Sequence, residues 1–110
     1  MIYKLKPLLT YNLWGGKKLS KIYYKKSSIY GEAWIMSCLK DMNSPIGKNK
    51  TLKDLFIENK NIIKKGYKGE FPLLVKLIDA NDDLSIQVHP EVKTECWHIL
   101  SSKPSKLYFG

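Results

Sequence analysis

A strict alternation of apolar and polar residues over residues 84–89 is the feature that most constrains the fold of this chain. The sequence there is Leu-Ser-Ile-Gln-Val-His, so the aliphatic side chains fall on one face of an extended strand and the polar ones on the other. Residues 94–100 form a second apolar-rich segment after a short turn, and the mostly apolar residues 71–78 precede both. Together these segments predict a mostly β fold.

Only one segment has the pattern of a helix, and it lies near residues 51–65. Thr51 is followed three residues later by Asp54, which matches a capping box at a helix start. The apolar residues that follow fall near one helical stripe, and Gly66 is a stop signal. The sequence therefore predicts one short helix here.

The remaining segments before residue 71 are predicted from local signals. Residues 31–39 have the composition of a strand, and residues 41–50 contain Ser-Pro and Gly, which are typical of a loop. The pair Gly15-Gly16 predicts a turn with positive φ, and the alternative is a close approach of the backbone to a ligand.

The length, charge and cysteine content of the chain restrict the classes of protein to which it can belong. A chain of 110 residues without internal repeats suits one domain, and it has no apolar run near the roughly 18 residues of a membrane span. We expect no secretory signal, and two cysteines without a disulfide framework suit the cytoplasm. All 19 basic residues are lysine and the net charge is +9, but the absence of arginine argues against specific nucleic-acid recognition.

The two segments on either side of residue 90 carry the candidate chemistry. If they pair as a hairpin with His89 opposite Glu95, then Gln87 lies opposite Trp97, and the glutamine, histidine and glutamate share one face. Oxygen and nitrogen donors of this kind suit zinc. From the spacing alone, an ordinary polar surface is the alternative.

A long stretch of the sequence resembles the type I mannose-6-phosphate isomerase (phosphomannose isomerase) family. The stretch is Phe71-Pro-Leu-Leu-Val-Lys-Leu-Ile-Asp-Ala-Asn-Asp-Asp-Leu-Ser-Ile-Gln-Val-His-Pro90, followed by Lys93-Thr-Glu-Cys-Trp97. Upstream, Leu-Trp-Gly-Gly-Lys-Lys-Leu, Gly-Glu-Ala-Trp and Lys-Thr-Leu-Lys-Asp-Leu occur in the order of the family. The resemblance implies a cupin-like, jelly-roll type barrel that is incomplete here, with residues 1–110 as the N-terminal portion of the catalytic domain.

The resemblance also implies an activity and a site. The activity is the interconversion of mannose 6-phosphate and fructose 6-phosphate, with a small sugar phosphate as partner and one zinc ion as cofactor. The implied residues are Gln87, His89 and Glu95 for the metal, Ser85 and Lys76 for substrate binding, and Lys93 for catalysis.

The sequence departs from the family pattern in two ways. Between His-Pro and Lys-Thr-Glu the family has a longer loop, whereas only Glu91 and Val92 remain here. Family members also continue beyond the equivalent of Gly110, through a further histidine ligand and an arginine. We therefore expect the isolated chain to be inactive or nearly so, with open sheet edges that favour homo-oligomers. The alternative is a non-catalytic cupin-like binding module or degenerate fragment with weak polyanion binding.

Overall fold

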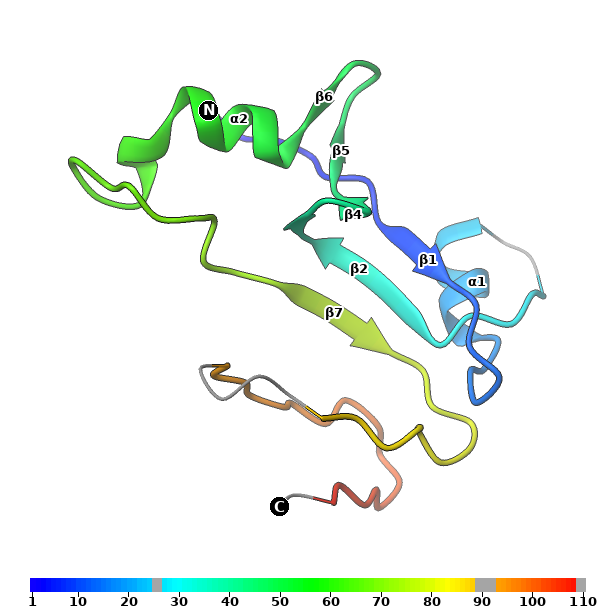
Figure 1. The fold of residues 1–110 in the computed structure, drawn as a ribbon. Helices are drawn as coiled ribbons and strands as arrows, with labels where there is room; N and C mark the ends of the chain where they lie inside the picture. Colours follow the sequence, from blue (N-terminus) through cyan, green and yellow to red (C-terminus); the bar gives the residue numbers. More distant parts are fainter. Residues whose placement is uncertain (25–26, 89–92, 109–110) are drawn as a thin grey trace.

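A computed structural model describes residues 1–24, 27–88 and 93–108 of the chain (Figure 1). In chain order the elements are β1 (Leu8–Thr10), α1 (Lys18–Tyr24), β2 (Glu32–Met36), β3 (Cys38–Leu39), β4 (Met42–Asn43), β5 (Pro45–Ile46), β6 (Lys50–Thr51), α2 (Leu52–Glu58), the 3-10 helix η1 (Lys60–Ile62) and β7 (Val75–Ile78). The fold is mostly β, with small antiparallel sheets and two short α-helices.

The largest sheet has three antiparallel strands in the order β1-β2-β7. Its register pairs Trp34 on the central strand with Leu8 on one side and Lys76 on the other. Cross-strand partners share a face of a sheet, so the side chains of Trp34 and Lys76 lie on the same side. The predicted strand at residues 31–39 is confirmed as β2 and β3, whereas the predicted strand at 71–78 is confirmed only for its second half.

Two short hairpins occupy the region that was predicted to be a loop. Strands β3 and β4 pair with each other, and so do β5 and β6. Gly47 lies in the β5–β6 turn with a φ of 63°, a conformation that favours glycine because it has no Cβ. The loop prediction for residues 41–50 was therefore wrong, because Gly47 marks a hairpin turn here, while Ser44 joins the two hairpins and Pro45 begins β5.

Helix α2 begins at the predicted capping box. The Asp54 backbone N–H donates to the Thr51 Oγ1 at 3.3 Å, and the Thr51 backbone N–H donates to an Asp54 carboxylate oxygen at 2.9 Å. These bonds satisfy N–H groups that a helix start otherwise leaves without partners. The α-helix ends at Glu58 and continues as η1, so regular helical structure stops a few residues before the predicted limit of 65.

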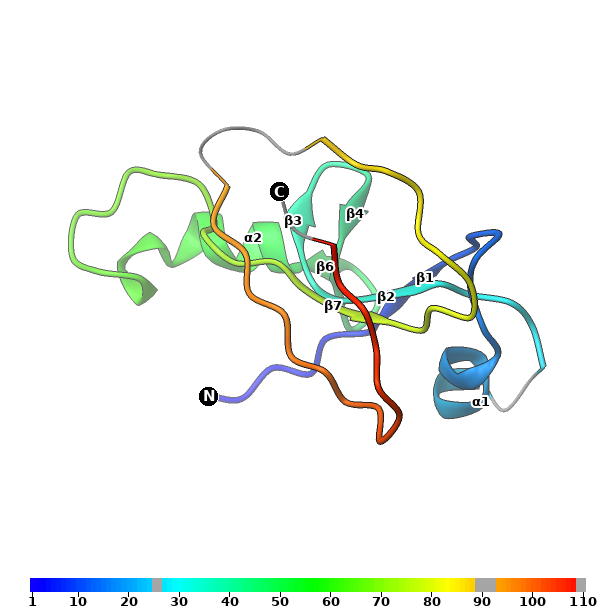
Figure 2. The same ribbon diagram turned by 90° about the horizontal axis from the view of Figure 1, so that it is seen from below.

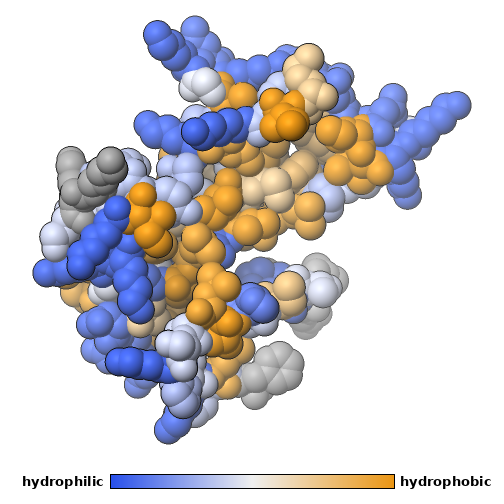
Figure 3. Space-filling model, turned by 180° about the vertical axis from the view of Figure 1, so that it is seen from behind, coloured by the Kyte–Doolittle hydropathy of each residue, from blue (hydrophilic) through white to orange (hydrophobic). Residues whose placement is uncertain are grey.

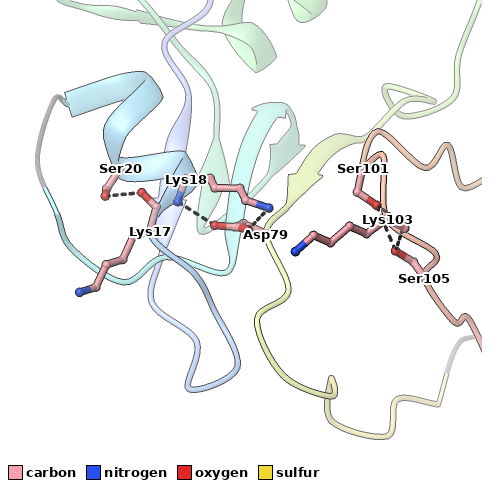
Figure 4. Close-up of polar contacts among 7 residues, drawn as sticks. All are labelled: Lys17, Lys18, Ser20, Asp79, Ser101, Lys103 and Ser105. Atoms are coloured by element: carbon pink, nitrogen blue, oxygen red, sulfur yellow. Dashed lines mark hydrogen bonds and ion pairs between the residues drawn. The ribbon is translucent and has the colours of Figure 1, made fainter.

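Helix α1 was not predicted, because its N-terminal cap comes from a distant residue. The Lys18 backbone N–H donates to the Asp79 Oδ2 at 2.8 Å, and the Lys18 ammonium lies 3.9 Å from the other carboxylate oxygen (Figure 4). Residues 18 and 79 are 61 positions apart in the sequence. A local pattern of residues carries no sign of such a cap.

The Gly15-Gly16 pair permits close packing and does not form a turn of positive φ. Among the described residues, the glycines with positive φ are Gly47 and Gly66. A Cβ at Gly15 would lie 2.5 Å from the backbone nitrogen of Gly31, and a Cβ at Gly16 would overlap the Asp79 carboxylate. The prediction of positive φ at this pair was therefore wrong, although the Gly15 N–H closes a turn on the Asn12 carbonyl at 2.9 Å, and the close approach is to the chain's own backbone and to Asp79.

The predicted hairpin around residue 90 is absent from the described residues. Residues 84–88 and 93–100 have no regular secondary structure, and no strand pairing joins them. The described part of the chain likewise contains no closed barrel. An alternating segment becomes a strand only when a neighbour accepts its backbone hydrogen bonds, and these segments have no such neighbour in the described structure.

The buried core is small for a chain of this length. The buried apolar residues of the described structure are Trp14, Leu19, Ala33, Leu52, Leu55 and Phe56. The radius of gyration is 15.9 Å, against about 13 Å for a compact domain of this size. Apolar residues are exposed across the middle of one face of the molecule (Figure 3).

Within the described residues, no helix has the length and apolar character that a membrane crossing requires.

Candidate functional site

A charged cluster lies on one face of the β1-β2-β7 sheet and is centred on Glu32. One oxygen of its carboxylate accepts a hydrogen bond from the Lys76 ammonium at 2.8 Å. The other oxygen accepts from the Trp34 indole Nε1 at 3.1 Å and from the Thr10 hydroxyl at 3.3 Å. The sheet register explains the cluster, because Thr10 is the cross-strand partner of Glu32 and Lys76 that of Trp34.

The environment of Lys76 differs from that of an ordinary surface lysine. Its side chain is 26% exposed, that of Glu32 is 13% exposed, and the ammonium lies 4.7 Å from the centre of the Trp34 ring. A cation over an aromatic face and beside a carboxylate is held in place by both. The structure therefore places Lys76, a predicted substrate-binding residue, in a fixed position at the sheet.

Lys93 and Glu95 form a second ion pair. The Lys93 ammonium lies 2.6 Å from the Glu95 carboxylate, and both side chains are about one-third exposed. The pair belongs to the segment 93–108, which passes across β7 when the molecule is seen from below (Figure 2). Lys93, Glu95 and Lys76 line the same open cavity of about 1030 Å³. The structure thus brings together three of the six predicted site residues.

The other predicted site residues are placed differently. Ser85 and Gln87 lie in the exposed segment before residue 89, and neither lines this cavity. His89 lies outside the described residues. Within residues 1–24, 27–88 and 93–108, no three histidine, cysteine, aspartate or glutamate side chains come together as a metal-binding group. The arrangement of Gln87, His89 and Glu95 on one strand face stays a prediction.

The cavity carries more positive than negative side chains. Six lysines line it, and the acidic side chains among its lining residues are Glu70 and Glu95. At Cys38, which also lines the cavity, burial raises the pKa of the thiol, and the positive charge of Lys53 partly opposes that shift. An excess of one sign of charge in a concave surface attracts ligands of the opposite sign.

Glu32 was missed by the sequence analysis. It belongs to the Gly-Glu-Ala-Trp motif, but the motif alone does not show that the carboxylate faces Lys76. A signal was nevertheless present, because Glu32 and Trp34 are two residues apart on a predicted strand and so share a face. An acidic residue on the inner face of a strand requires a cationic or hydrogen-bonding partner.

Comparison with known proteins decides the family. The sequence profile described as "Phosphomannose isomerase type I, catalytic domain" matches residues 2–108. The chain belongs to the type I phosphomannose isomerase family. The profile match covers almost the whole chain, including the β1-β2-β7 sheet and the segment with Lys93 and Glu95.

Several curated proteins are similar to this member of the phosphomannose isomerase family. The "Probable mannose-6-phosphate isomerase GmuF" of Bacillus subtilis is 37% identical over 117 residues, which cover 90% of this chain and 37% of that protein. The "Mannose-6-phosphate isomerase" of Streptococcus mutans is 34% identical over 107 residues, covering 82% of this chain and 34% of that protein. The chain therefore spans about a third of the length of these relatives.

A solved structure supports the same assignment. The crystal structure of the mannose 6-phosphate isomerase from Bacillus subtilis matches with a TM-score of 0.57 and 28% identity, over 69% of this chain and 26% of that one. The alignment with GmuF also shows that this chain is shorter than the relative within the matched region. It runs over 117 residues but covers 90% of this chain, about 99 residues, so about 18 positions of the relative have no counterpart here.

Proposed function

We propose that this chain is part of a zinc-dependent mannose-6-phosphate isomerase that interconverts mannose 6-phosphate and fructose 6-phosphate in the cytoplasm. The observation that carries the proposal is the match of residues 2–108 to the type I catalytic domain. The cavity that Lys76, Lys93 and Glu95 share supports it. In this proposal the small sheets belong to an open jelly-roll barrel of the cupin type, and the 110 residues alone do not turn over substrate.

The proposed metal ligands are Gln87, His89 and Glu95, whose oxygen and nitrogen donors suit zinc. In the described residues the Glu95 carboxylate is paired with the Lys93 ammonium, and no three histidine, cysteine, aspartate or glutamate side chains come together. His89 lies outside the described residues, and those that are described do not by themselves complete a zinc site. For that reason the chemistry proposed for this chain rests on its lysines.

The isomerisation moves a hydrogen between C1 and C2 of the sugar while the carbonyl group moves the other way. Negative charge develops on oxygen when a general base takes the proton from one carbon, and the proton is then returned to the neighbouring carbon. The ammonium of Lys93 can stabilise that charge, because a fixed positive group in a cleft acts more strongly than one in water. Glu95, at 2.6 Å, orients this ammonium, while Lys76 and Ser85 contribute to substrate binding in the proposal.

A chimera tests the proposed function. This chain replaces the matching segment of the Bacillus subtilis relative of known structure, and isomerisation of mannose 6-phosphate is measured. We expect turnover by the chimera and a loss of kcat of about a hundredfold in Lys93→Ala, since removal of one charge-stabilising donor has effects of this order. The control is Lys17→Ala, an exposed lysine next to α1. An inactive but folded chimera would contradict the proposal.

Metal content is measured on the same proteins. We expect bound zinc by elemental analysis in the chimera and in Lys93→Ala, and reduced zinc in Glu95→Ala. An equal zinc content in the chimera and in its Glu95→Ala variant would remove Glu95 from the proposed ligands.

A second candidate function is a non-catalytic module that binds phosphorylated sugars. The excess of lysines around the cavity favours it. This candidate predicts an inactive chimera together with measurable binding of mannose 6-phosphate by the 110-residue chain.

A further inference from the structure

The lysines of the cavity fall into two groups that differ in their partners. Lys76 lies 2.8 Å from Glu32, and Lys93 lies 2.6 Å from Glu95, so each has a carboxylate beside it. The other four are Lys40, Lys53, Lys60 and Lys68. Within the described part of the chain, none of these four ammonium groups forms an ion pair with a carboxylate.

The four lysines without ion pairs all line the cavity, and the part of its lining that carries them is called the α2–η1 wall below. Lys53 is on α2 and Lys60 begins η1, while Lys40 lies in the turn between β3 and β4 and Lys68 in the loop after η1. The Lys60 ammonium lies 5.9 Å from the centre of the Phe56 ring, which belongs to the buried core. Lys53 and Cys38 both line the cavity, and the positive charge of Lys53 partly opposes the rise that burial causes in the pKa of the Cys38 thiol.

Two of the acidic side chains near this wall, Asp54 and Glu58, have other partners. The Asp54 carboxylate, next to Lys53 in the sequence, accepts hydrogen bonds from the Thr51 backbone and hydroxyl. Glu58 is paired with Lys50, which does not line the cavity. Glu70 is the acidic side chain that lines the same region. The wall therefore keeps a positive excess that an ion pair within the described structure does not cancel.

We propose that Lys53 and Lys60, with Lys40 and Lys68 beside them, form an anion-binding subsite on the α2–η1 wall of the cavity, which takes the phosphate group of a phosphorylated sugar. The inference rests on the proposed function for the identity of the sugar. An arriving phosphate needs no displacement of a carboxylate at this wall, whereas at Lys76 or Lys93 it competes with Glu32 or Glu95. The subsite thus separates phosphate binding from the lysine proposed for the chemistry.

The test uses the 110-residue chain and inorganic phosphate as the probe. Amide chemical shifts are recorded during a phosphate titration at constant ionic strength, with chloride as the balancing anion. We expect shifts at Cys38, Lys53 and Lys60, and we expect the double variant Lys53→Gln/Lys60→Gln to weaken binding about fivefold, as two exposed ionic contacts would. The matched control is Lys17→Gln/Lys21→Gln near α1, which lies far from α2 (Figure 1) and should change binding less than about twofold.

Each other result overturns the proposal. An equal loss of phosphate affinity in the two double variants would show that phosphate is attracted by the net charge alone. If phosphate changed the amide chemical shifts of Lys76 and Lys93 alone, and did so equally in Lys53→Gln/Lys60→Gln, the phosphate would be bound at the two lysines that have carboxylate partners. No binding at low ionic strength, where the screening length is about 30 Å, would exclude the subsite. Circular dichroism of each variant verifies that it is folded.

A parallel titration separates this proposal from the proposed function. Mannose 6-phosphate and uncharged mannose are added to the same proteins. Phosphate binding at the α2–η1 wall without isomerase activity in the chimera would refute the proposed function and retain the subsite. An active chimera whose KM for mannose 6-phosphate is unchanged by Lys53→Gln/Lys60→Gln would refute the subsite and retain the function.

Discussion

The carboxylate of Glu32 holds the ammonium of Lys76 at 2.8 Å on a face of the three-stranded sheet where both side chains are largely shielded from water. The same carboxylate accepts hydrogen bonds from the Trp34 indole and the Thr10 hydroxyl. All three strands of the sheet therefore contribute a side chain to one hydrogen-bonded cluster. Such a cluster fixes side-chain positions more firmly than an isolated surface pair.

The Glu32–Lys76 pair should contribute measurably to stability. A double-mutant cycle with Glu32→Gln and Lys76→Met should give a coupling energy of about 1–2 kcal/mol in urea unfolding. The control pair is Lys50 and Glu58, whose side chains are more exposed, and we expect a smaller coupling there. Equal coupling in the two cycles would show that shielding at the sheet has no energetic effect.

The cap that Asp79 provides should matter for α1. Asp79→Ala removes the acceptor of the Lys18 N–H, and loss of an N-terminal cap costs about 1 kcal/mol in the free energy of unfolding. Urea unfolding measures the change. Asp83→Ala, at an exposed position, is the control and should stay within about 0.5 kcal/mol of the parent.

The capping box of α2 should make helix stability depend on pH. The hydrogen bonds from Thr51 lower the pKa of the Asp54 carboxyl below its ordinary value. The stabilisation is therefore complete above the ordinary carboxyl range, near pH 4, and is lost as the pH falls through the lower pKa of the folded state. Thr51→Ala should lower stability by about 1 kcal/mol at pH 7 and flatten this pH dependence. Ser27→Ala, at an exposed position, should leave the pH profile of unfolding unchanged.

The two cysteines should differ in reactivity. Burial raises the pKa of the Cys38 thiol, and the thiolate is the reactive form, so alkylation of Cys38 should be slow at neutral pH and rise at higher pH. Cys96 is exposed and should react first. Mass spectrometry after iodoacetamide treatment distinguishes the two. Alkylation of Cys38 ahead of Cys96 in the native protein would contradict the described burial.

The outer edge of the sheet should promote self-association. β7 is the last strand in the order β1-β2-β7, and Val75 at its start is exposed. Sedimentation should show association that increases with protein concentration, and Val75→Lys should weaken it, because a charge at an edge strand opposes pairing. Ile22→Lys on α1 is the control for added charge alone. A monomer at every concentration would contradict the expectation.

The parts of the fold that the sequence predicted are those with local causes. The start of α2 follows from Thr51 and Asp54, three residues apart, and the central strand follows from its own composition. Helix α1 could not be predicted in the same way, because its cap, Asp79, lies in another part of the chain. The alternation at residues 84–88 predicted a strand, but without a pairing neighbour the segment does not form one in the described structure.

The candidate site was predicted mainly through the family resemblance. The resemblance identified Lys76, Lys93 and Glu95, which the structure places around one cavity. It did not identify Glu32 or the lysines of the α2–η1 wall. Those residues are recognised from the distances and partners of their side chains, which depend on how separate segments pack.

The contact between Asp79 and α1 also orders events during synthesis of the chain. The ribosome makes residue 79 only after 61 further residues follow Lys18, which at about 5–20 residues per second takes about 3–12 s. Until then the first helix lacks its cap, and Gly16 lacks the Asp79 carboxylate against which it packs. Nascent chains that stop before Asp79 should therefore remain open to proteases at residues 15–24, whereas chains extended past Asn81, whose N–H donates to the Trp14 carbonyl at 2.8 Å, should become resistant there.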